Sequence, residues 1–408
     1  MGNRYLINDI CDVGSSKRIY LSEYQNSGIA FYRGKEIIEK DSNREISNEL
    51  FISHERYNEI KKKFGVPQKG DILMTAVGTI GISWYVNESN FYFKDGNLIW
   101  FKNFKKDRVN SKYLYYIFKS KQFSEIIKNI SIGSTQKAIT IEQVKKIELN
   151  FPKIEIQNKI VKILDNINNK IKINNELNNN LYQLTNELFE EKILNNQDKD
   201  NWKEYRLSDI SKMINGYSYK GNELIQKSDI GMITIKNFER TGGFKPDGFK
   251  DIIPKKCKSD HYVRPFEVLV ACTDLTQNAD IIGNAIMLLN NSDYKEVIMS
   301  MDLVKLVPTT KLVDNYMLYA IVNSNNFKNF ALGYKSGTTV LHLNKICFKE
   351  YTIKLPNEKL LKDLSKVIEI NYKKISQIIE ENKKLEQLKD ALLPKLMNGE
   401  IDLDNVEI

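Results

Sequence analysis

Cysteine and histidine are scarce in this 408-residue sequence, and both are scattered. The four cysteines (Cys11, Cys257, Cys272 and Cys347) include no CxxC pair, and the three histidines lie far apart. This usage is typical of a reduced, cytosolic protein without a zinc site. Cys257 and His261 stand four residues apart, but no second pair of ligands accompanies them, so we interpret them as structural. We expect no metal site in the chain.

Long apolar runs are also missing. No stretch of about 18 apolar residues occurs, and the N-terminal MGNRYLINDICDVG has no apolar core of the kind that a signal peptide needs. We therefore expect a cytoplasmic protein that neither crosses a membrane nor is exported.

The motifs of three catalytic classes are absent. None of the eight prolines is adjacent to another, so the Asn-Pro-Pro-aromatic motif of adenine methyltransferases is missing. The closest approach to a phosphate-binding GxxxxGK[ST] loop, GYSYKGN at residues 216–222, lacks the lysine and the hydroxyl. Asp302 and Lys305 are only a fragment of a nuclease carboxylate cluster, and we attribute their spacing to chance. We expect no catalytic residues and no cofactor site in this chain.

A long internal repeat is the main positive feature. The segment GSTQKAITIEQVKKIELNFP at residues 133–152 returns as GTTVLHLNKICFKEYTIKLP at 337–356, each opening on glycine with a hydroxyl pair and ending in proline. The same offset of 204 aligns Ser120 with Ser324 and Phe123 with Phe327. Near the start of each copy, RYLINDI at 4–10 returns as YRLSDI at 205–210. These matches indicate a duplicated domain followed by a duplicated helix, related by a pseudo-twofold axis.

The predicted elements of the two copies correspond. Residues 70–86, with Gly78 and Gly81, predict two buried strands around a tight turn, and residues 266–289 are their counterpart. The second copy carries six more residues here, within TDLTQNAD. Residues 91–101 and 297–307 predict further strands, whereas 113–130 and 315–330 predict short amphipathic helices. The fold class is mixed, α/β or α+β.

Each copy ends in a helix about 40 residues long with heptad spacing, about 60 Å at 1.5 Å per residue. We predict that the two helices pair antiparallel, with three asparagines fixing their register. The polar NNQDKDN at 195–201 joins the copies, and Pro394 with Gly399 is expected to end the second helix. The predicted seam is Ile160, Ile163, Ile167, Asn174, Leu177, Leu181, Leu184, Leu188, Leu364, Ile368, Asn371, Ile375, Ile378, Asn382, Leu385 and Leu392. The resulting division is 1–152 and 196–356 for the globular units, with 153–195 and 357–408 for the helices.

The net charge of +9 indicates a polyanionic partner. A ribosome, a membrane surface and nucleic acid fit equally well, and a solvated surface accounts for any single lysine. We selected candidate anion- and base-contacting residues by loop position and side-chain chemistry. They are Lys17, Arg18, Arg33, Lys35, Arg44, Lys61, Lys62, Thr75, Thr79, Ser134, Thr135, Gln136, Lys137, Tyr217, Tyr219, Lys220, Arg240, Lys245, Thr273, Thr276, Gln277, Asn278, Lys335, Thr338, Thr339 and His342.

The paired blocks ILMTAVGTIG (72–81) and LVACTDLTQNADIIG (269–283), the GST and GTT turns, and the two long helices ending in LPKLMNGEI resemble the specificity subunits of type I restriction-modification systems. The resemblance covers nearly the whole chain. It implies two target-recognition domains, each reading one half of an asymmetric bipartite DNA sequence, and a coiled coil that sets the gap and docks two modification subunits.

The resemblance also places the chemistry elsewhere. S-adenosylmethionine would belong to the modification subunits and ATP to a restriction or motor subunit, and Mg²⁺ is likewise expected in the partner subunits. Two alternatives stay open. One is a catalytic methyltransferase or endonuclease component of a single-chain restriction system, which incorporation of S-adenosylmethionine by the isolated chain would reveal. The other is a non-catalytic coiled-coil scaffold, which salt-dependent DNA binding would exclude.

Overall fold

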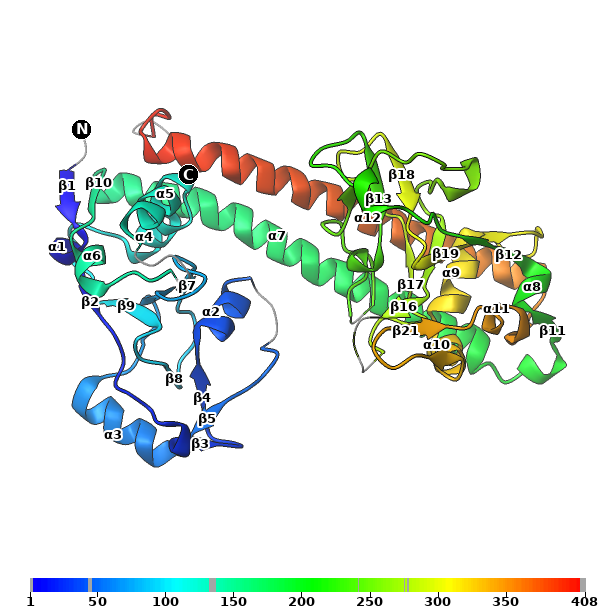
Figure 1. Cartoon of the computed structure of the whole chain (residues 1–408), viewed down its shortest axis with the longest axis horizontal. Coiled ribbons are helices and arrows are strands. Elements are labelled where there is room, and N and C mark those ends of the chain that lie inside the picture. The colour runs from blue at the N-terminus through cyan, green and yellow to red at the C-terminus, as the bar shows by residue number, and fades with distance from the viewer. Residues whose placement is uncertain are drawn as a thin grey trace. The chain divides into compact units, whose positions relative to one another are not determined.

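Two compact units make up the structure, a computed structural model that describes residues 3–42, 46–131, 137–240, 242–274, 276 and 279–403 (Figure 1). Unit 1 consists of Met1–Asn169 and Glu386–Ile408, and unit 2 of Lys170–Leu385. Each unit thus contains a stretch of both long helices, whereas the sequence-based division gave each helix a segment of its own. The difference arises because the helices pack into the globular cores.

A four-stranded antiparallel sheet lies in each unit, with the same strand order. In unit 1 the order is β2 (Asp12–Gly14), β9 (Leu98–Lys102), β6 (Ile72–Thr75), β7 (Ser83–Tyr85). In unit 2 it is β12 (Ser211–Asn215), β19 (Leu303–Pro308), β15 (Val268–Ala271), β17 (Ala285–Met287). The repeat seen in the sequence is therefore a repeat of topology.

The other sheets follow a similar correspondence. β1 (Asn3–Leu6) pairs with β10 (Glu148–Phe151), and β11 (Lys203–Arg206) pairs with β22 (Thr352–Leu355). β4 (Ile29–Tyr32) runs parallel to β8 (Phe91–Phe93), beside β5 (Phe51–Ile52) and β3 (Tyr24–Gln25), so this sheet of unit 1 also has four strands, in the order β3, β5, β4, β8. β13 (Ile230–Ile233) runs parallel to β18 (Glu296–Met299), beside β14 (Lys250–Asp251). Unit 2 adds a sheet of β16 (Thr273–Asp274), β21 (Leu341–Leu343) and β20 (Lys335–Ser336).

The short helices are capped alike in the two units. The ranges 113–130 and 315–330 each hold parts of two helices, α4 (Ser111–Phe118) with α5 (Lys121–Ile130), and α9 (Asn315–Asn323) with α10 (Asn325–Leu332). Ser120 accepts the N–H of Phe123 at 3.2 Å, and Ser324 accepts that of Phe327 at 3.2 Å, as N-caps of α5 and α10. The others are α1 (Ile7–Ile10), α2 (Gly34–Asp41), α3 (His54–Phe64), α6 (Ile141–Lys145), α8 (Leu207–Ile210) and α11 (Cys347–Glu350).

The two long helices are α7 (Ile154–Phe189), which continues as a π-helical turn over Glu190–Leu194, and α12 (Glu358–Met397). In unit 2, Asn174 donates to Asn382 at 2.8 Å and Asn371 donates to Thr185 at 3.2 Å. Residue numbers rise along one helix as they fall along the other, so the helices are antiparallel in this unit. Among the described residues, neither these helices nor any other could cross a membrane.

Two residues of the predicted seam, Leu177 and Leu184, do not face the helix contact. Leu177 and Leu184 are 39% and 46% exposed, while Asn178 and Thr185 occupy the inward positions at 8% and 2%. The heptad prediction failed here because a straight α-helix turns every 3.6 residues and drifts away from a strict seven-residue repeat. Of the other predicted positions, Ile160, Ile167, Asn174, Leu364, Ile368, Ile375 and Ile378 are buried, and Ile163, Leu181, Leu188, Asn371, Asn382, Leu385 and Leu392 are half-buried.

Pro394 does not end the second helix, contrary to the sequence-based prediction. It lies inside α12, which continues to Met397. Proline costs the helix one hydrogen bond, but Leu396, two residues later, is buried in the core of unit 1, and this packing holds the last turn in place. Gly399 follows with a φ of 72°, a left-handed conformation that suits glycine after a helix end.

Candidate nucleic-acid interface

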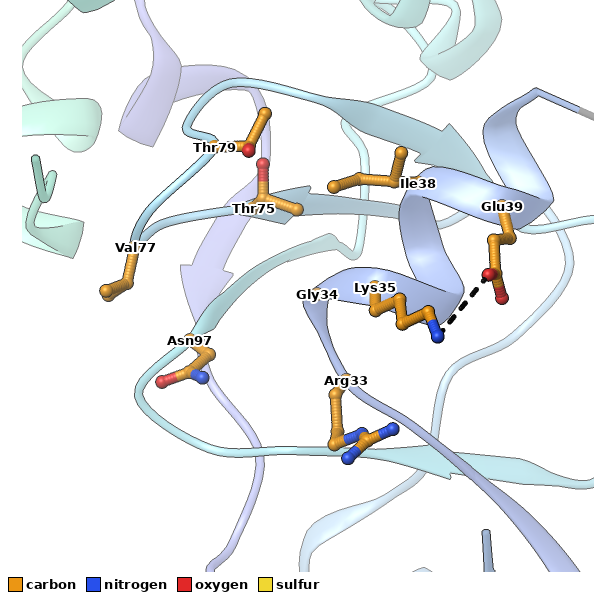
Figure 2. Close-up of a pocket in the computed structure, with 9 residues that line it drawn as sticks. All are labelled: Arg33, Gly34, Lys35, Ile38, Glu39, Thr75, Val77, Thr79 and Asn97. Atoms are coloured by element: carbon orange, nitrogen blue, oxygen red, sulfur yellow. Dashed lines mark ion pairs between the residues drawn. The ribbon is translucent and has the colours of Figure 1, made fainter. Parts of the chain in front are cut away.

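A cavity of about 570 Å³ in unit 1 brings together several candidate residues. Its lining comes from the N-cap and first turns of α2, the end of β6 and the connection after it, and the turn before β9 (Figure 2). The lining residues are Arg33, Gly34, Lys35, Ile38, Glu39, Thr75, Val77, Thr79 and Asn97. Four of them, Arg33, Lys35, Thr75 and Thr79, were singled out by chemistry and loop position alone. Asn97, which follows an aspartate and a glycine in a turn, was not predicted from the sequence.

Arg33 is the N-cap of α2 and is held by Glu36. Its Nε lies 3.2 Å from Oε2 and its Nη2 lies 2.7 Å from Oε1, while its backbone N–H also donates to Oε2 at 2.7 Å. Glu36 is fully buried. Burial alone would raise the pKa of Glu36, but the hydrogen bonds from Arg33 outweigh it and the pKa lies below its ordinary value. The carboxylate is therefore charged, and it fixes the guanidinium beside the cavity.

The hairpin after β6 supplies the threonines. Thr75 is buried, and its hydroxyl accepts the N–H of Ile82 at 3.0 Å, so it closes the hairpin and is not available to a ligand. This corrects its selection as a contact residue. Thr79 is exposed, and the N–H of Gly78 donates to the carbonyl of Lys137 at 3.0 Å. The hairpin tip and the exposed Lys137, far apart in the sequence, therefore lie side by side.

The corresponding region of unit 2 is the small sheet of β16, β21 and β20. Thr273 faces His342 in register, and His342 faces Ser336, next to Lys335. His342 and Lys335 are exposed, as are Thr338 and Thr339 after β20. Thr273 and Asp274, next to the extra residues of the second copy, thus pair with the strand that follows the GTT turn, and among the described residues of unit 1 the corresponding pairing is the bridge between Val77 and Ala138.

Asp274 anchors the loop that carries the extra residues. It is 1% exposed and accepts the N–H and hydroxyl of Thr276 at 2.8 and 2.9 Å, and the N–H of Ile281 at 2.7 Å. Burial would raise the pKa of Asp274, but these donors lower it below its ordinary value. Only hydroxyl and amide residues were predicted as contacts in this segment. An aspartate two residues before a threonine, a frequent start of an Asx-turn, is the sequence signal for the role of Asp274.

Tyr217 was selected wrongly. It is 3% exposed, and its hydroxyl donates to Glu223 at 2.6 Å while accepting the backbone N–H groups of Lys255 and Lys256, each at 3.2 Å. Lys255 and Lys256 are distant in the sequence, so the buried hydroxyl joins two segments of unit 2 and has no open position for a ligand contact. Tyr219 is half-buried, and its hydroxyl lies 3.1 Å from the Lys250 ammonium.

The remaining candidates are spread over both units. Lys17, Arg18, Lys61 and Lys62 are exposed in unit 1, and Lys220 and Arg240 are exposed in unit 2. Arg18 pairs with Asp95 at 2.9 Å, Arg240 with Asp280 at 3.8 Å, and the half-buried Lys245 with Asp247 at 3.7 Å. Thr273 donates to Asp302 at 3.1 Å. Arg44, Ser134, Thr135, Gln136, Gln277 and Asn278 lie outside the described residues.

The Cys257 sulfur lies 3.7 Å from Nδ1 of His261. In the part of the chain that the structure describes, no group of three or more histidine, cysteine, aspartate or glutamate side chains could hold a metal ion.

Comparisons with known proteins place this repeat in a family. The model of the type I restriction modification DNA specificity domain matches residues 4–183 and 199–389. The chain belongs to that family. One match therefore covers each globular copy with most of its helix, and the chain is a DNA-recognizing specificity subunit of a type I restriction-modification system.

Individual relatives agree with this assignment. The type I restriction enzyme MjaIX specificity subunit of Methanocaldococcus jannaschii is 24% identical over 98% of this chain and 93% of its own. A Haemophilus influenzae protein provisionally named as a type I specificity subunit is 33% identical over 39% of this chain and 38% of its own. The crystal structure of the type I S subunit from M. genitalium, 16% identical, superposes with a TM-score of 0.56 over 97% of this chain and 95% of its own, so the fold is shared.

For the specificity subunit we predict that Asp274→Ala loosens the backbone at Thr276 and Ile281. The substitution leaves the N–H groups of Thr276 and Ile281 without their acceptor, so local opening should become about 10-fold more frequent or greater. Hydrogen exchange of those amides measures this. Asp274→Asn, which keeps one carbonyl oxygen, should show a smaller increase. Equal exchange in wild type and Asp274→Ala would contradict the anchoring role.

Proposed function

We propose that each unit of the specificity subunit reads one half of an asymmetric bipartite duplex sequence. The main support is the cavity of unit 1, where Arg33, Asn97 and Thr79 line a space open to a ligand. Donors and acceptors of this kind match the edges of bases in the major groove. Unit 2 presents different side chains at the corresponding surface, among them Thr273 and His342. Different readers in the two units would give different half-sites.

The proposal divides the basic residues by role. Exposed lysines such as Lys61, Lys62 and Lys137 carry charge without a fixed geometry, which suits phosphate contacts that give affinity but little sequence discrimination. Residues held by the fold near the cavity suit base contacts. Binding would then depend strongly on salt, while selectivity would depend on the cavity.

The helix pair is proposed to set the gap between half-sites and to dock two modification subunits. An apolar stripe on α7 supports docking: Ile173, Leu177 and Leu184 are 58%, 39% and 46% exposed. At 100° per residue these three positions fall within about 40° of one another on the helix surface. An exposed apolar stripe of this kind is typical of a surface that a partner covers.

Catalysis is proposed to belong to the partners. The sequence has neither the Asn-Pro-Pro-aromatic motif nor a phosphate-binding loop. The modification subunits would contribute S-adenosylmethionine and methyl transfer, and a restriction subunit would contribute ATP- and Mg²⁺-dependent steps. This chain would contribute the choice of sequence.

The test compares the isolated chain with its complex with modification subunits. We expect no methyl transfer by the chain alone, weak and strongly salt-dependent DNA binding, and specific binding with methylation once the modification subunits are added. Leu177→Glu with Leu184→Glu should leave the helical circular dichroism unchanged and lower complex formation by about 100-fold or more, since two charges would enter a buried apolar contact.

Ile346→Glu is the matched control, because Ile346 is 44% exposed but lies outside both long helices. It should assemble like the wild type. Methyl transfer by the purified chain would overturn the non-catalytic assignment. Normal assembly of the double variant would remove the α7 stripe from the docking surface.

A further inference from the structure

The Arg33–Glu36 pair is close to electrically neutral, and this bears on what Arg33 can bind. The fully buried carboxylate contacts the guanidinium at 2.7 and 3.2 Å, so it cancels most of the positive charge that an anion would sense. A phosphate gains less from such a pair than from a free cation. A neutral acceptor loses little, because the remaining N–H groups still donate. The pair therefore favours a base edge over the backbone of a nucleic acid.

The geometry leaves donors for such an edge. A guanidinium has five N–H groups in one plane. Two of these N–H groups, one on Nε and one on Nη2, donate to Glu36, the partner that the described residues provide. The outer edge keeps two parallel donors, on Nη1 and Nη2. Two parallel donors match O6 and N7 of guanine, the pairing that arginine makes most often in the major groove. The Arg33 side chain is 32% exposed and lines the cavity, so part of it can meet a ligand although Glu36 is buried beneath it.

Unit 2 has the same backbone device without the arginine. There the turn also follows a parallel strand, and Thr234 takes the place of Arg33 while Asn237 takes that of Glu36. The Thr234 N–H donates to Oδ1 of Asn237 at 2.9 Å, just as the Arg33 N–H donates to Glu36. Thr234 and Asn237 are both buried. The hydrogen bond from the N-cap N–H to the side chain three residues later is thus common to both units. Because unit 2 makes it with neutral residues, capping alone does not require the charged Arg33–Glu36 pair.

We propose that Arg33 reads a guanine in the half-site bound by unit 1, with Glu36 as the positioning residue that holds its guanidinium. This rests on the proposed function of unit 1 as a reader of duplex DNA. Glu36 does not touch the base. It fixes the plane of the guanidinium and reduces its attraction for phosphate.

The experiment uses the chain in complex with its modification subunits, in two readouts. Methylated sequences are mapped in cells, and binding is measured on duplexes in which each base pair of the native site is changed in turn. Arg33→Gln should lower discrimination at one G·C pair by about 10- to 100-fold and leave the half-site of unit 2 unchanged. Arg33→Lys should do the same, because a lysine keeps the charge but lacks the planar pair of donors.

Glu36→Gln separates positioning from simple support of the fold. It should relax the same G·C position, and it should steepen the decrease of log K with log salt by up to about one unit, since an uncompensated guanidinium can now take a phosphate. A merely structural role would not move the salt slope. Arg56→Gln is the matched control: Arg56 also pairs with a carboxylate, Glu59 at 2.8 Å, on α3, which contributes nothing to the cavity lining.

The outcomes separate the two proposals. Uniform weakening on all duplexes by Arg33→Gln, or full rescue by Arg33→Lys, would make Arg33 a phosphate contact and overturn the inference while unit 1 stays a DNA reader. Unchanged binding and an unchanged methylated sequence in every Arg33 and Glu36 variant would remove the cavity from the interface and overturn its proposed function as well.

Discussion

Replacing residues 11–130 by the corresponding region of a related specificity subunit is expected to change one half of the methylated sequence completely and to leave the other half unaltered. The region starts just after α1 and ends with α5, and it contains the cavity and its hairpin. Its side chains pack in cores built from residues of unit 1 alone, while the largest core of unit 2 is built from residues 189–375. The replacement therefore leaves the second core untouched.

Long-read mapping of methylated bases in cells that also express the modification subunits measures the result. The reciprocal replacement, residues 211–334, should change only the other half. A simultaneous change in both halves from either replacement would show that the units do not read independently. Loss of all methylation with a folded chain would point to lost assembly, which size-exclusion chromatography of the complex can report.

Leu396→Ala is expected to destabilise unit 1, although residue 396 stands almost at the end of the chain. Leu396 is 3% exposed in a core formed chiefly by residues 7–164, and Leu403 is 4% exposed in the same core. The Lys159 ammonium also donates to the carbonyl of Leu403 at 2.7 Å. A large-to-small change at a buried leucine costs about 2–5 kcal/mol. That is a large share of the roughly 5–15 kcal/mol by which a domain is stable.

Leu388→Ala is the matched control, since Leu388 lies on the same helix and is 46% exposed. Its effect should stay within about 0.5 kcal/mol. Hydrogen exchange measures both variants: in Leu396→Ala, protection should fall in the sheet of β2, β9, β6 and β7 and persist in that of β12, β19, β15 and β17. Equal protection of the first sheet in wild type and Leu396→Ala would contradict the role of the C-terminal segment.

The sequence was most informative where a local rule repeats. Ser120 and Ser324 were aligned by their offset, and both cap a helix with the same hydrogen bonds, because capping depends on residues only a few positions apart. The polar positions Asn174 and Asn382, read from a heptad pattern, do contact each other in unit 2. The heptad pattern wrongly predicted that Leu177 faces inward, because a seven-residue repeat differs slightly from two turns of a straight α-helix.

The candidate site was less accessible from sequence, because the partners that decide availability come from elsewhere in the fold. Thr75 and Tyr217 have the right chemistry for base contacts, yet Ile82 and Glu223 occupy their hydroxyls. Conversely, Arg33 was selected for its positive charge, but the buried Glu36 neutralises most of that charge. The geometry of its donors, and not its charge, suits it to a base contact. The sequence identifies side chains whose chemistry suits DNA contacts. The packed structure shows which of them are buried or already hydrogen-bonded to other residues.

The contribution of residues 386–403 to unit 1 has a consequence for synthesis of the protein. The N-terminus of a chain emerges from the ribosome first, and domains generally fold as they emerge. Unit 2 has all its residues once Leu385 has left the exit tunnel, whereas the core of unit 1 still lacks Leu396 and Leu403. The unit that is translated first is therefore completed last. Until Leu396 and Leu403 emerge, the open core of unit 1 is exposed apolar surface, which favours aggregation of the nascent chain.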